Sequence, residues 1–494
     1  MEKVALVYLN RTRPPLFSLG LEYLGAALRR EGFEVEVLDL CLAEDPERAI
    51  RDFFSRDEFF AVGVNLRNLD DMSVAVPRFF LGEYREMVEL IKKHTSAPLI
   101  LGGPAFTLVP KGILDFMGVE MGIRGEGEES LPLLLKKMRA GEPLDDVPGL
   151  VLRRGARVLS NPPKPLNLAD LPTPARGILD VPRYFREGGI AFVEARRGCD
   201  KKCIYCPDPW IKTPPLRFRS PESVVREIEV LAEMGVDHIY FSDSEFNAPD
   251  EEFACEICRR MIERKLHEKI QWYVDILPVP FSEEFCKLLR RAGCAGVAFN
   301  IDVCCDRMLR NIKRDFTVEE IRAAAEIAHR NELPFVFYLL FGMPGEDRET
   351  VRESIENLKR LPAEGFETVL GVRVIPGTEL AEMIKREGPL SQNPGVYGEK
   401  EDNEDLLKPV FYISPQLGPE PEARAYIADL IGDDERFFFR RRSEGPSEAT
   451  FGSNELLVKA IEMGYRGIHW DILRKLAHDG IIDKLRAEIL GEAR

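Results

Sequence analysis

Three cysteines near the middle of the chain are spaced for metal chemistry. Cys199, Cys203 and Cys206 fall within eight residues, so their thiolates can surround one small inorganic core. A 4Fe-4S cube has four irons to ligate, and three cysteines leave one of them open to an outside ligand. The spacing therefore predicts an iron-sulfur cluster at which a bound molecule can react.

Two other uses of cysteine remain as alternatives. A structural zinc ion would need a fourth ligand, such as Cys255 or Cys258, to complete its tetrahedron. An auxiliary cluster would use these two or Cys304 and Cys305. Because Cys255 and Cys258 are three residues apart in a predicted helix with apolar neighbours, we expect them to pack as small apolar side chains.

The segment from residue 188 to residue 390 must position the cysteines. Its short apolar runs alternate with amphipathic stretches, as parallel strands and crossover helices do. Six strands and five helices between them suit an open, partial (β/α)6 TIM-like barrel, with the cysteines directly after the first strand and the active face at the carboxyl ends. The predicted strands cover residues 190–195, 238–242, 271–276, 297–301, 335–341 and 369–375, and the helices cover residues 221–233, 251–265, 283–291, 318–330 and 348–360.

Residues 1–145 show the same alternation and predict a Rossmann-like, doubly wound α/β domain. In such a sheet ligands bind beyond the carboxyl ends of the strands. Glycines there let a bulky ligand approach the main chain, because no Cβ intervenes. The predicted strand ends carry Arg67-Asn68, Gly102-Gly103-Pro104 and Gly125-Glu126-Gly127-Glu128.

Two further segments complete the chain. Residues 146–187 are rich in proline, which predicts a stiff linker that fixes the spacing of the two domains. Residues 391–494 begin with an acidic run at 399–405 and then indicate a mainly helical segment. Its position predicts that these helices cap the open side of the partial barrel and shape the substrate pocket.

The cysteine pattern C-x-x-x-C-x-aromatic-C, with Tyr205 as the aromatic residue, resembles that of radical S-adenosylmethionine (SAM) enzymes. The resemblance implies that Cys199, Cys203 and Cys206 hold a 4Fe-4S cluster. It also implies that the amino and carboxylate groups of SAM bind the open iron. An electron then enters the sulfonium, and a 5′-deoxyadenosyl radical forms.

The same resemblance implies further SAM contacts. Asp243 ends the second barrel strand, where the family holds the SAM amino group, although the usual Gly-Gly-Glu is absent. Asn300 and Asp302 end the fourth strand, where the family contacts the ribose and methionine parts. Gly342 and Pro344 lie in a turn that resembles the one near adenine. Each of these sites is also compatible with an ordinary turn at a strand end.

A Rossmann-like domain ahead of such a barrel resembles the cobalamin-binding subfamily. The D-x-H-x-x-G motif, which offers a histidine to cobalt, is missing, and His94 is the only histidine before the barrel. Arg67 is therefore expected near the lower face of the cobalt, with an ion pair to Asp70 or Asp71 as the alternative. The resemblance assigns to cobalamin Arg67, Gly102, Gly103, Pro104, Gly125, Glu126 and Gly127.

Composition excludes several classes of protein. The net charge is −16, and no basic stripe is present to follow a phosphate backbone, so nucleic acid is not expected as a partner. No apolar run reaches the roughly 20 residues of a membrane span. Met1 leads into a strand pattern rather than a signal peptide, which predicts a cytoplasmic protein with reduced cysteines. The sequence does not predict the oligomeric state.

These features predict a cobalamin-dependent radical SAM methyltransferase. The resemblance implies that one SAM methylates Co(I), a second SAM yields the radical, and a small-molecule or peptide substrate receives the methyl group. An electron donor such as flavodoxin or ferredoxin is implied as a partner. The alternatives are a radical SAM enzyme of a non-methylating type, for ring formation, rearrangement or lipid modification, and an iron-sulfur electron carrier or scaffold.

Overall fold

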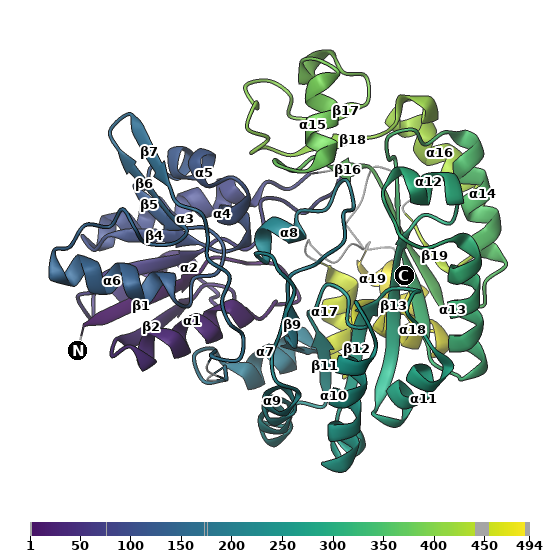
Figure 1. Ribbon diagram of the computed structural model, residues 1–494, viewed down its shortest axis with the longest axis horizontal. Helices are drawn as coiled ribbons and strands as arrows, with labels where there is room; N and C mark the ends of the chain where they lie inside the picture. The colour runs from purple at the N-terminus through teal and green to yellow at the C-terminus, as the bar shows by residue number, and fades with distance from the viewer. Residues whose placement is uncertain (1, 76, 172, 175, 440–453, 490–494) are drawn as a thin grey trace.

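The structure is a computed structural model that describes residues 2–75, 77–171, 173–174, 176–439 and 454–489. Two lobes, each built on one large sheet, lie side by side (Figure 1). No helix of the residues so described is long and apolar enough to cross a membrane.

The first lobe has a seven-stranded sheet with strand order β2-β1-β3-β4-β5-β6-β7, parallel from β2 to β5 and antiparallel at β6 and β7. Leu6 packs into the core on one face of the sheet, and Val7 packs into the core on the other. Both faces are thus buried, as a parallel sheet requires. The strands are β1 (Lys3–Tyr8), β2 (Glu34–Asp39), β3 (Ala61–Asn65), β4 (Leu99–Gly102), β5 (Met121–Ile123), β6 (Leu150–Arg154) and β7 (Arg157–Ser160).

Helices cover both faces of this sheet, which confirms the predicted doubly wound fold. Leu21 of α1 and Leu134 of α6 pack on one face, and Ile50 of α2, Val88 of α3 and Ile113 of α5 pack on the other. The helices are α1 (Leu19–Arg30), α2 (Pro46–Phe54), α3 (Phe80–His94), α4 (Pro104–Leu108), α5 (Pro110–Met117) and α6 (Ser130–Ala140).

The segment for which the sequence predicts a linker, residues 146–187, is partly regular. Its β6 and β7 form a hairpin that extends the first sheet. Its end forms α7 (Val181–Gly188), which leads into the second lobe. The sequence does not predict the hairpin, because its strands are short and follow a stretch rich in turns.

The second lobe is an open sheet with strand order β19-β15-β14-β13-β12-β11-β8, and every pair in it is parallel. Five of the six predicted barrel strands are present, whereas the sixth, β15, lies mostly before its predicted range of 369–375, which also covers β16 of a separate small sheet. A seventh, β19, was not predicted because it is only two residues long. The strands are β8 (Ala191–Val193), β11 (His238–Phe241), β12 (Gln271–Ile276), β13 (Cys294–Asp302), β14 (Phe335–Phe341), β15 (Gly365–Leu370) and β19 (Phe437–Phe438).

Helices pack against the outer face of this open barrel (Figure 1). They are α9 (Pro221–Glu233), α10 (Glu252–Glu263), α11 (Glu283–Arg291), α12 (Asp306–Asn311), α13 (Val318–Arg330), α14 (Arg348–Lys359) and α16 (Glu420–Ile431). Smaller elements border the carboxyl ends of the barrel strands. They are β9 (Arg196–Arg197), α8 (Asp208–Ile211), β10 (Arg217–Phe218), β16 (Val372–Arg373), α15 (Glu379–Arg386), β17 (Val396–Gly398) and β18 (Val410–Tyr412).

The last helices fill the inside of the barrel near the amino-terminal ends of its strands. They are α17 (Glu455–Glu462), α18 (His469–His478) and α19 (Ile482–Ile489). Trp470 of α18 packs edge-on against Tyr273, with ring centroids 5.8 Å apart, and also against Ala298 and Val336. The hydroxyl of Tyr273 donates to Asp471 over 2.6 Å. These helices therefore close the barrel from the end opposite its active face.

Buried charges join the two lobes. Arg373 of β16 donates to Asp70, which follows β3, over 2.8 Å, and their side chains are only 1% and 2% exposed. Arg373 also donates to backbone carbonyls at Val374 and Leu406. Because both charges are removed from water, each needs the other as its partner. The pair therefore fixes the edge of the first lobe against β16.

We expect Asp70→Ala to lower the free energy of unfolding by about 3–5 kcal/mol, because it leaves the Arg373 guanidinium buried without a counter-charge. The double variant Asp70→Ala and Arg373→Met should lose less free energy of unfolding than Asp70→Ala alone. Denaturant titration followed by circular dichroism measures both. The exposed pair of Lys287 and Glu283 supplies the control, since Glu283→Ala should change stability by no more than about 1 kcal/mol. Equal losses for Asp70→Ala and Glu283→Ala would contradict the expectation.

Candidate active site

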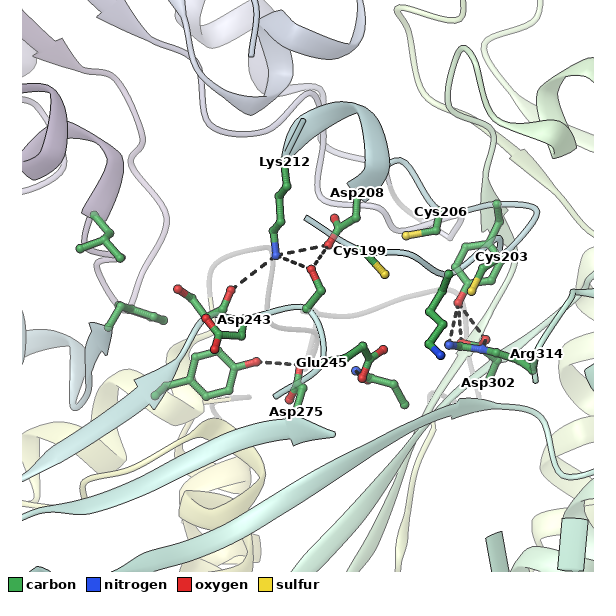
Figure 2. A pocket seen from close by; sticks show the side chains of 18 of the residues that line it. Cys199, Cys203, Cys206, Asp208, Lys212, Asp243, Glu245, Asp275, Asp302 and Arg314 are labelled. Atoms are coloured by element: carbon green, nitrogen blue, oxygen red, sulfur yellow. Dashed lines mark hydrogen bonds and ion pairs between the residues drawn. The ribbon is translucent and has the colours of Figure 1, made fainter. Parts of the chain in front are cut away.

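A cavity of about 460 Å³ lies at the carboxyl ends of the barrel strands, where the first lobe meets the second (Figure 2). We call it the junction cavity. Most residues that the sequence assigned to the cluster and to SAM are brought together here, and so is Arg67, which it assigned to cobalamin. Those that line it are Arg67, Cys199, Cys203, Tyr205, Cys206, Asp243, Asn300 and Asp302.

The loop that carries the cysteines begins at β9 and is fixed at both ends. Gly198 has a φ of +98°, and a Cβ there would meet the carbonyl oxygen of Pro215 at 2.8 Å, so only glycine fits. Ile204 is buried, its N–H donates to the carbonyl of Ile312, and its own carbonyl accepts from Leu380. Anchored in this way, the loop presents its three half-buried thiols to the cavity.

The three thiols fit an iron-sulfur cluster better than a zinc ion. Figure 2 shows their sulfur atoms on one side of the cavity. Burial raises the pKa of Cys203 to about 11 and also raises the pKa values of Cys199 and Cys206, so a metal centre is needed to stabilise thiolates here. Within the described ranges, no group of three or more ligating side chains is arranged for a single ion. A cluster of four irons, by contrast, accepts thiolates that are farther apart.

The other cysteines behave as small apolar residues. Cys258 is fully buried in the core, and Cys255 packs against that core, as predicted. Cys304 and Cys305 are also buried. None of these four is among the residues that line the junction cavity. The structure therefore gives no support to the zinc site or to the auxiliary cluster.

Tyr205 fastens the cysteine loop to the end of β13. Its hydroxyl lies 2.8 Å from both carboxylate oxygens of Asp302, and Arg314 donates to Asp302 over 2.7 Å and to the Tyr205 oxygen over 3.1 Å. Asp302 was expected to contact SAM, but these two partners already engage its carboxylate. Arg314 was missed by sequence reasoning, because no local pattern pairs it with Tyr205, 109 positions earlier.

Asp243 has one oxygen engaged and one free. Its Oδ1 accepts from the backbone N–H groups of Ala195 and Arg196 at 2.8 and 3.2 Å, whereas its Oδ2 is buried without a partner in the described chain. Burial raises the pKa of Asp243 to about 6 and that of Glu245, nearby on the cavity wall, to about 8. Glu245 receives a long contact of 3.5 Å from the amide of Asn300. Free carboxylate oxygens in a cavity are available to a ligand.

Several other lining residues were missed by sequence reasoning. Lys212 donates to the Ser244 hydroxyl over 2.7 Å, and Ser244 donates to Asp208 over 2.7 Å, which makes a closed polar network beside the cluster loop (Figure 2). The position of Asp208, two residues after Cys206, was the only available signal. The missed lining residues are Phe17, Leu19, Phe192, Lys201, Asp208, Lys212, Tyr240, Ser242, Ser244, Glu245, Asp275 and Arg314.

The glycine-bearing segments do not line the junction cavity. Gly103 has a φ of +94°, and a Cβ there would meet the Leu66 carbonyl at 2.6 Å, so its glycine serves the packing of two strand ends. Glu126, expected to bind cobalamin, instead binds Arg217 through both oxygens at 2.7 Å and accepts from the N–H of Leu166. Its carboxylate thus joins the lobes, and its assignment to cobalamin stays a prediction. The other residues outside the cavity lining are Gly102, Pro104, Gly125, Gly127, Gly342 and Pro344.

Arg67 lies just after β3 and lines the cavity, and its predicted position beside the cobalt stays a prediction. Its Nη1 is buried without a hydrogen-bond partner among the described atoms. The alternative ion pairs are not formed, because Asp70 binds Arg373 and Asp71 accepts from the N–H groups of Ser73 and Arg78. A cationic side chain with a free donor thus faces the cavity from the first lobe.

Comparisons with known proteins agree with this arrangement. The family models for the Radical SAM superfamily and the B12 binding domain match residues 193–384 and 6–135. Tryptophan 2-C-methyltransferase of Streptomyces laurentii is 30% identical over 87% of this chain and 82% of its own length. The radical SAM methyltransferase TsrM of Kitasatospora setae, with tryptophan and the SAM analogue aza-SAM bound, superposes with a TM-score of 0.90 at 28% identity, covering 98% of this chain and all of that one. With cobalamin and a [4Fe-4S] cluster bound, it superposes with a TM-score of 0.87 at 27% identity, covering 99% of this chain and 100% of that one.

Fold and site together define a radical SAM enzyme with an N-terminal B12-binding domain. The chain belongs to the cobalamin-dependent radical SAM methyltransferases. The predicted class is thereby confirmed over the non-methylating enzyme and the electron carrier that the sequence left as alternatives.

Replacing any one of Cys199, Cys203 and Cys206 by alanine should abolish the stable cluster, because two thiolates leave two irons without protein ligands. Iron and sulfide content after anaerobic reconstitution, together with the visible absorption band, measures the loss. Cys255→Ala is the matched control, since this thiol is outside the cavity lining and should leave iron content unchanged. Full iron content in any of the three variants would refute the assignment.

The turn after β14 should make stability depend on pH. Glu346 is fully buried, accepts from the N–H groups of Gly342 and Met343, and has its pKa raised by burial to about 8. The folded protein therefore keeps this proton while the unfolded chain releases it near pH 4.5. Between these values the free energy of unfolding should fall by about 1.4 kcal/mol for each pH unit.

Glu346→Gln should remove this contribution, because the amide accepts the same hydrogen bonds and does not titrate. The variant should gain stability over the original protein as the pH rises from about 5 to about 8. Urea titrations at these two pH values measure the difference. An unchanged difference at both would show that Glu346 does not titrate in this range.

Proposed function

We propose that this protein transfers a methyl group to a carbon atom of an aromatic amino acid such as tryptophan. The observation that carries the proposal is the junction cavity itself, which combines aromatic walls at Phe17, Phe192 and Tyr240 with the cysteine loop and Arg67. Relatives that match over nearly the whole chain support it, because one is named as a tryptophan 2-C-methyltransferase and another was solved with tryptophan as substrate.

In this proposal the cysteine loop holds a 4Fe-4S cluster, and SAM lies beside it, within reach of the free oxygen of Asp243 and of Asn300. The cluster supplies electrons, and cobalamin carries the methyl group. Tyr205, tied to Asp302 and Arg314, keeps the loop in one position. The aromatic walls exclude water from the substrate.

Cobalamin in this proposal lies over the carboxyl edge of the first sheet, with Arg67 facing the cobalt. Gly102, Gly103 and Pro104, together with the turn at Gly125 and Gly127, border that edge. A histidine ligand is not available from the only histidine of the lobe, His94, which is exposed at the end of α3. Arg67, a cation that cannot ligate a metal, would face the cofactor from the end of β3, and the cofactor would supply the methyl-transfer chemistry.

We further propose that a flavodoxin or ferredoxin donates the electrons and that the protein works in the cytoplasm. All ten cysteines are free thiols, which a reducing compartment would preserve. The substrate is taken to be a small molecule, because the cavity is of the size that encloses one.

Anaerobically reconstituted protein, supplied with cobalamin, a reductant, L-tryptophan and SAM labelled in its methyl group, should yield tryptophan that carries one labelled methyl. Mass spectrometry detects the transfer, and NMR locates the carbon. Cys203→Ala should reduce turnover to background, since it lacks the cluster. Release of 5′-deoxyadenosine without any methylated product would contradict the proposal.

A further inference from the structure

One carboxylate of the junction cavity lies apart from the cysteine loop and has no role in the site described so far. Asp275, near the end of β12, faces the inside of the barrel with Tyr240 of β11. The hydroxyl of Tyr240 donates to Oδ2 of Asp275 over 2.7 Å. Oδ1 is buried and has no hydrogen-bond partner among the described residues. The side chain is thus held in place with one oxygen free.

The carboxylates of the cavity differ in their partners, and Asp243, which like Asp275 keeps one oxygen without a partner in the described chain, is held by two backbone N–H groups beside the cysteine loop. Asp208 is paired with Lys212, and Asp302 is paired with Arg314. Burial raises the pKa of Asp275 to about 7, and the nearest cations, His469 and Lys212, which lower it, are paired with Glu367 and Asp208 instead. A buried carboxylate without a counter-charge is unfavourable, so a cationic ligand is favoured there.

The surroundings of Asp275 indicate what kind of cation would bind. The rings of Phe192 and Tyr240 meet edge-on, with centroids 6.0 Å apart, and both line the cavity. Deeper in the barrel the space is closed by Tyr273, on the same face of β12, and Trp470. An ammonium group on an aromatic or apolar body therefore fits, with its charge at Asp275 and its body along the rings.

We propose that Asp275, oriented by Tyr240, binds the ammonium group of the methyl-accepting substrate. This rests on the proposed function, which supplies an amino acid as that substrate. Figure 2 shows Asp275 across the cavity from the sulfur atoms of Cys203 and Cys206. The enzyme would thus select an amine by its charge at one end of the cavity, while the chemistry takes place at the other.

Two ligands separate the ammonium group from the rest of the substrate. L-Tryptophan carries it, and indole-3-propionate keeps the same ring and carboxylate but lacks it. Calorimetry on the anaerobically reconstituted full chain gives a Kd for each. The original protein should prefer tryptophan. Asp275→Asn should raise the Kd for tryptophan about ten- to hundredfold, as expected for a lost charge-assisted hydrogen bond, and should leave the Kd for indole-3-propionate within about twofold.

Variants and controls make the result specific. Tyr240→Phe keeps the charge of Asp275 but removes the hydrogen bond that orients its carboxylate. This variant should therefore lose part of the preference for tryptophan over indole-3-propionate. Asp237→Asn, at the exposed opposite end of β11, should keep all of it. The Kd for SAM should be the same in Asp275→Asn and the original protein, and near-ultraviolet circular dichroism verifies that the variants are folded.

Three results would overturn the proposal. An unchanged preference in Asp275→Asn means that another group binds the ammonium, and loss of the preference in Glu245→Gln instead would identify that group. A weaker Kd for SAM in Asp275→Asn means that the carboxylate belongs to the SAM site. If neither ligand binds the original protein, the proposed substrate class fails and this inference fails with it, whereas binding with an unchanged preference defeats the inference alone.

Discussion

The placement of the site depends on charges buried between the lobes. Arg197 of β9 binds Glu128 of the first lobe over 2.7 Å and lies two residues before Cys199. Arg217 of β10, the strand paired with β9, binds Glu126. Because a buried charge that loses its partner is strongly destabilising, the lobes are held at one spacing. The β9–β10 pair, which makes these contacts between the lobes, also leads into the cysteine loop. The loop therefore has a fixed position relative to the B12-binding lobe.

Acidic side chains in the cavity fall into two groups according to their partners. Asp302 and Asp208 are neutralised by Arg314 and Lys212, and they hold the loop and its neighbours in place. Asp243 and Asp275 each keep one oxygen without a partner in the described structure. Polar atoms that are buried and unpaired are rare in folded proteins because they are unfavourable. In this cavity such oxygens are available to a ligand.

The sequence could predict what local pattern determines. The strands of both lobes and the cysteine loop follow from apolar runs and from residue spacing, and Arg67 follows from its place at a strand end. Asp275 and Arg314 could not be found in this way, because their importance arises from the inward face of a strand and from a contact across 109 positions. Gly103 was assigned to cobalamin, and the structure shows that the nearby Leu66 carbonyl by itself requires a glycine there. A glycine indicates that some group lies close to the backbone, but it does not identify that group.

The last helices close the open barrel at the amino-terminal ends of its strands. A sheet that does not close would let water reach the cavity from the amino-terminal ends of its strands, and Trp470 occupies that space. Its neighbour Tyr273 stands two residues before Asp275 on the same face of β12. Residues at the far end of the chain therefore set the depth of the space above Asp275. The predicted role of this segment in shaping the substrate pocket stays a prediction, which this packing supports.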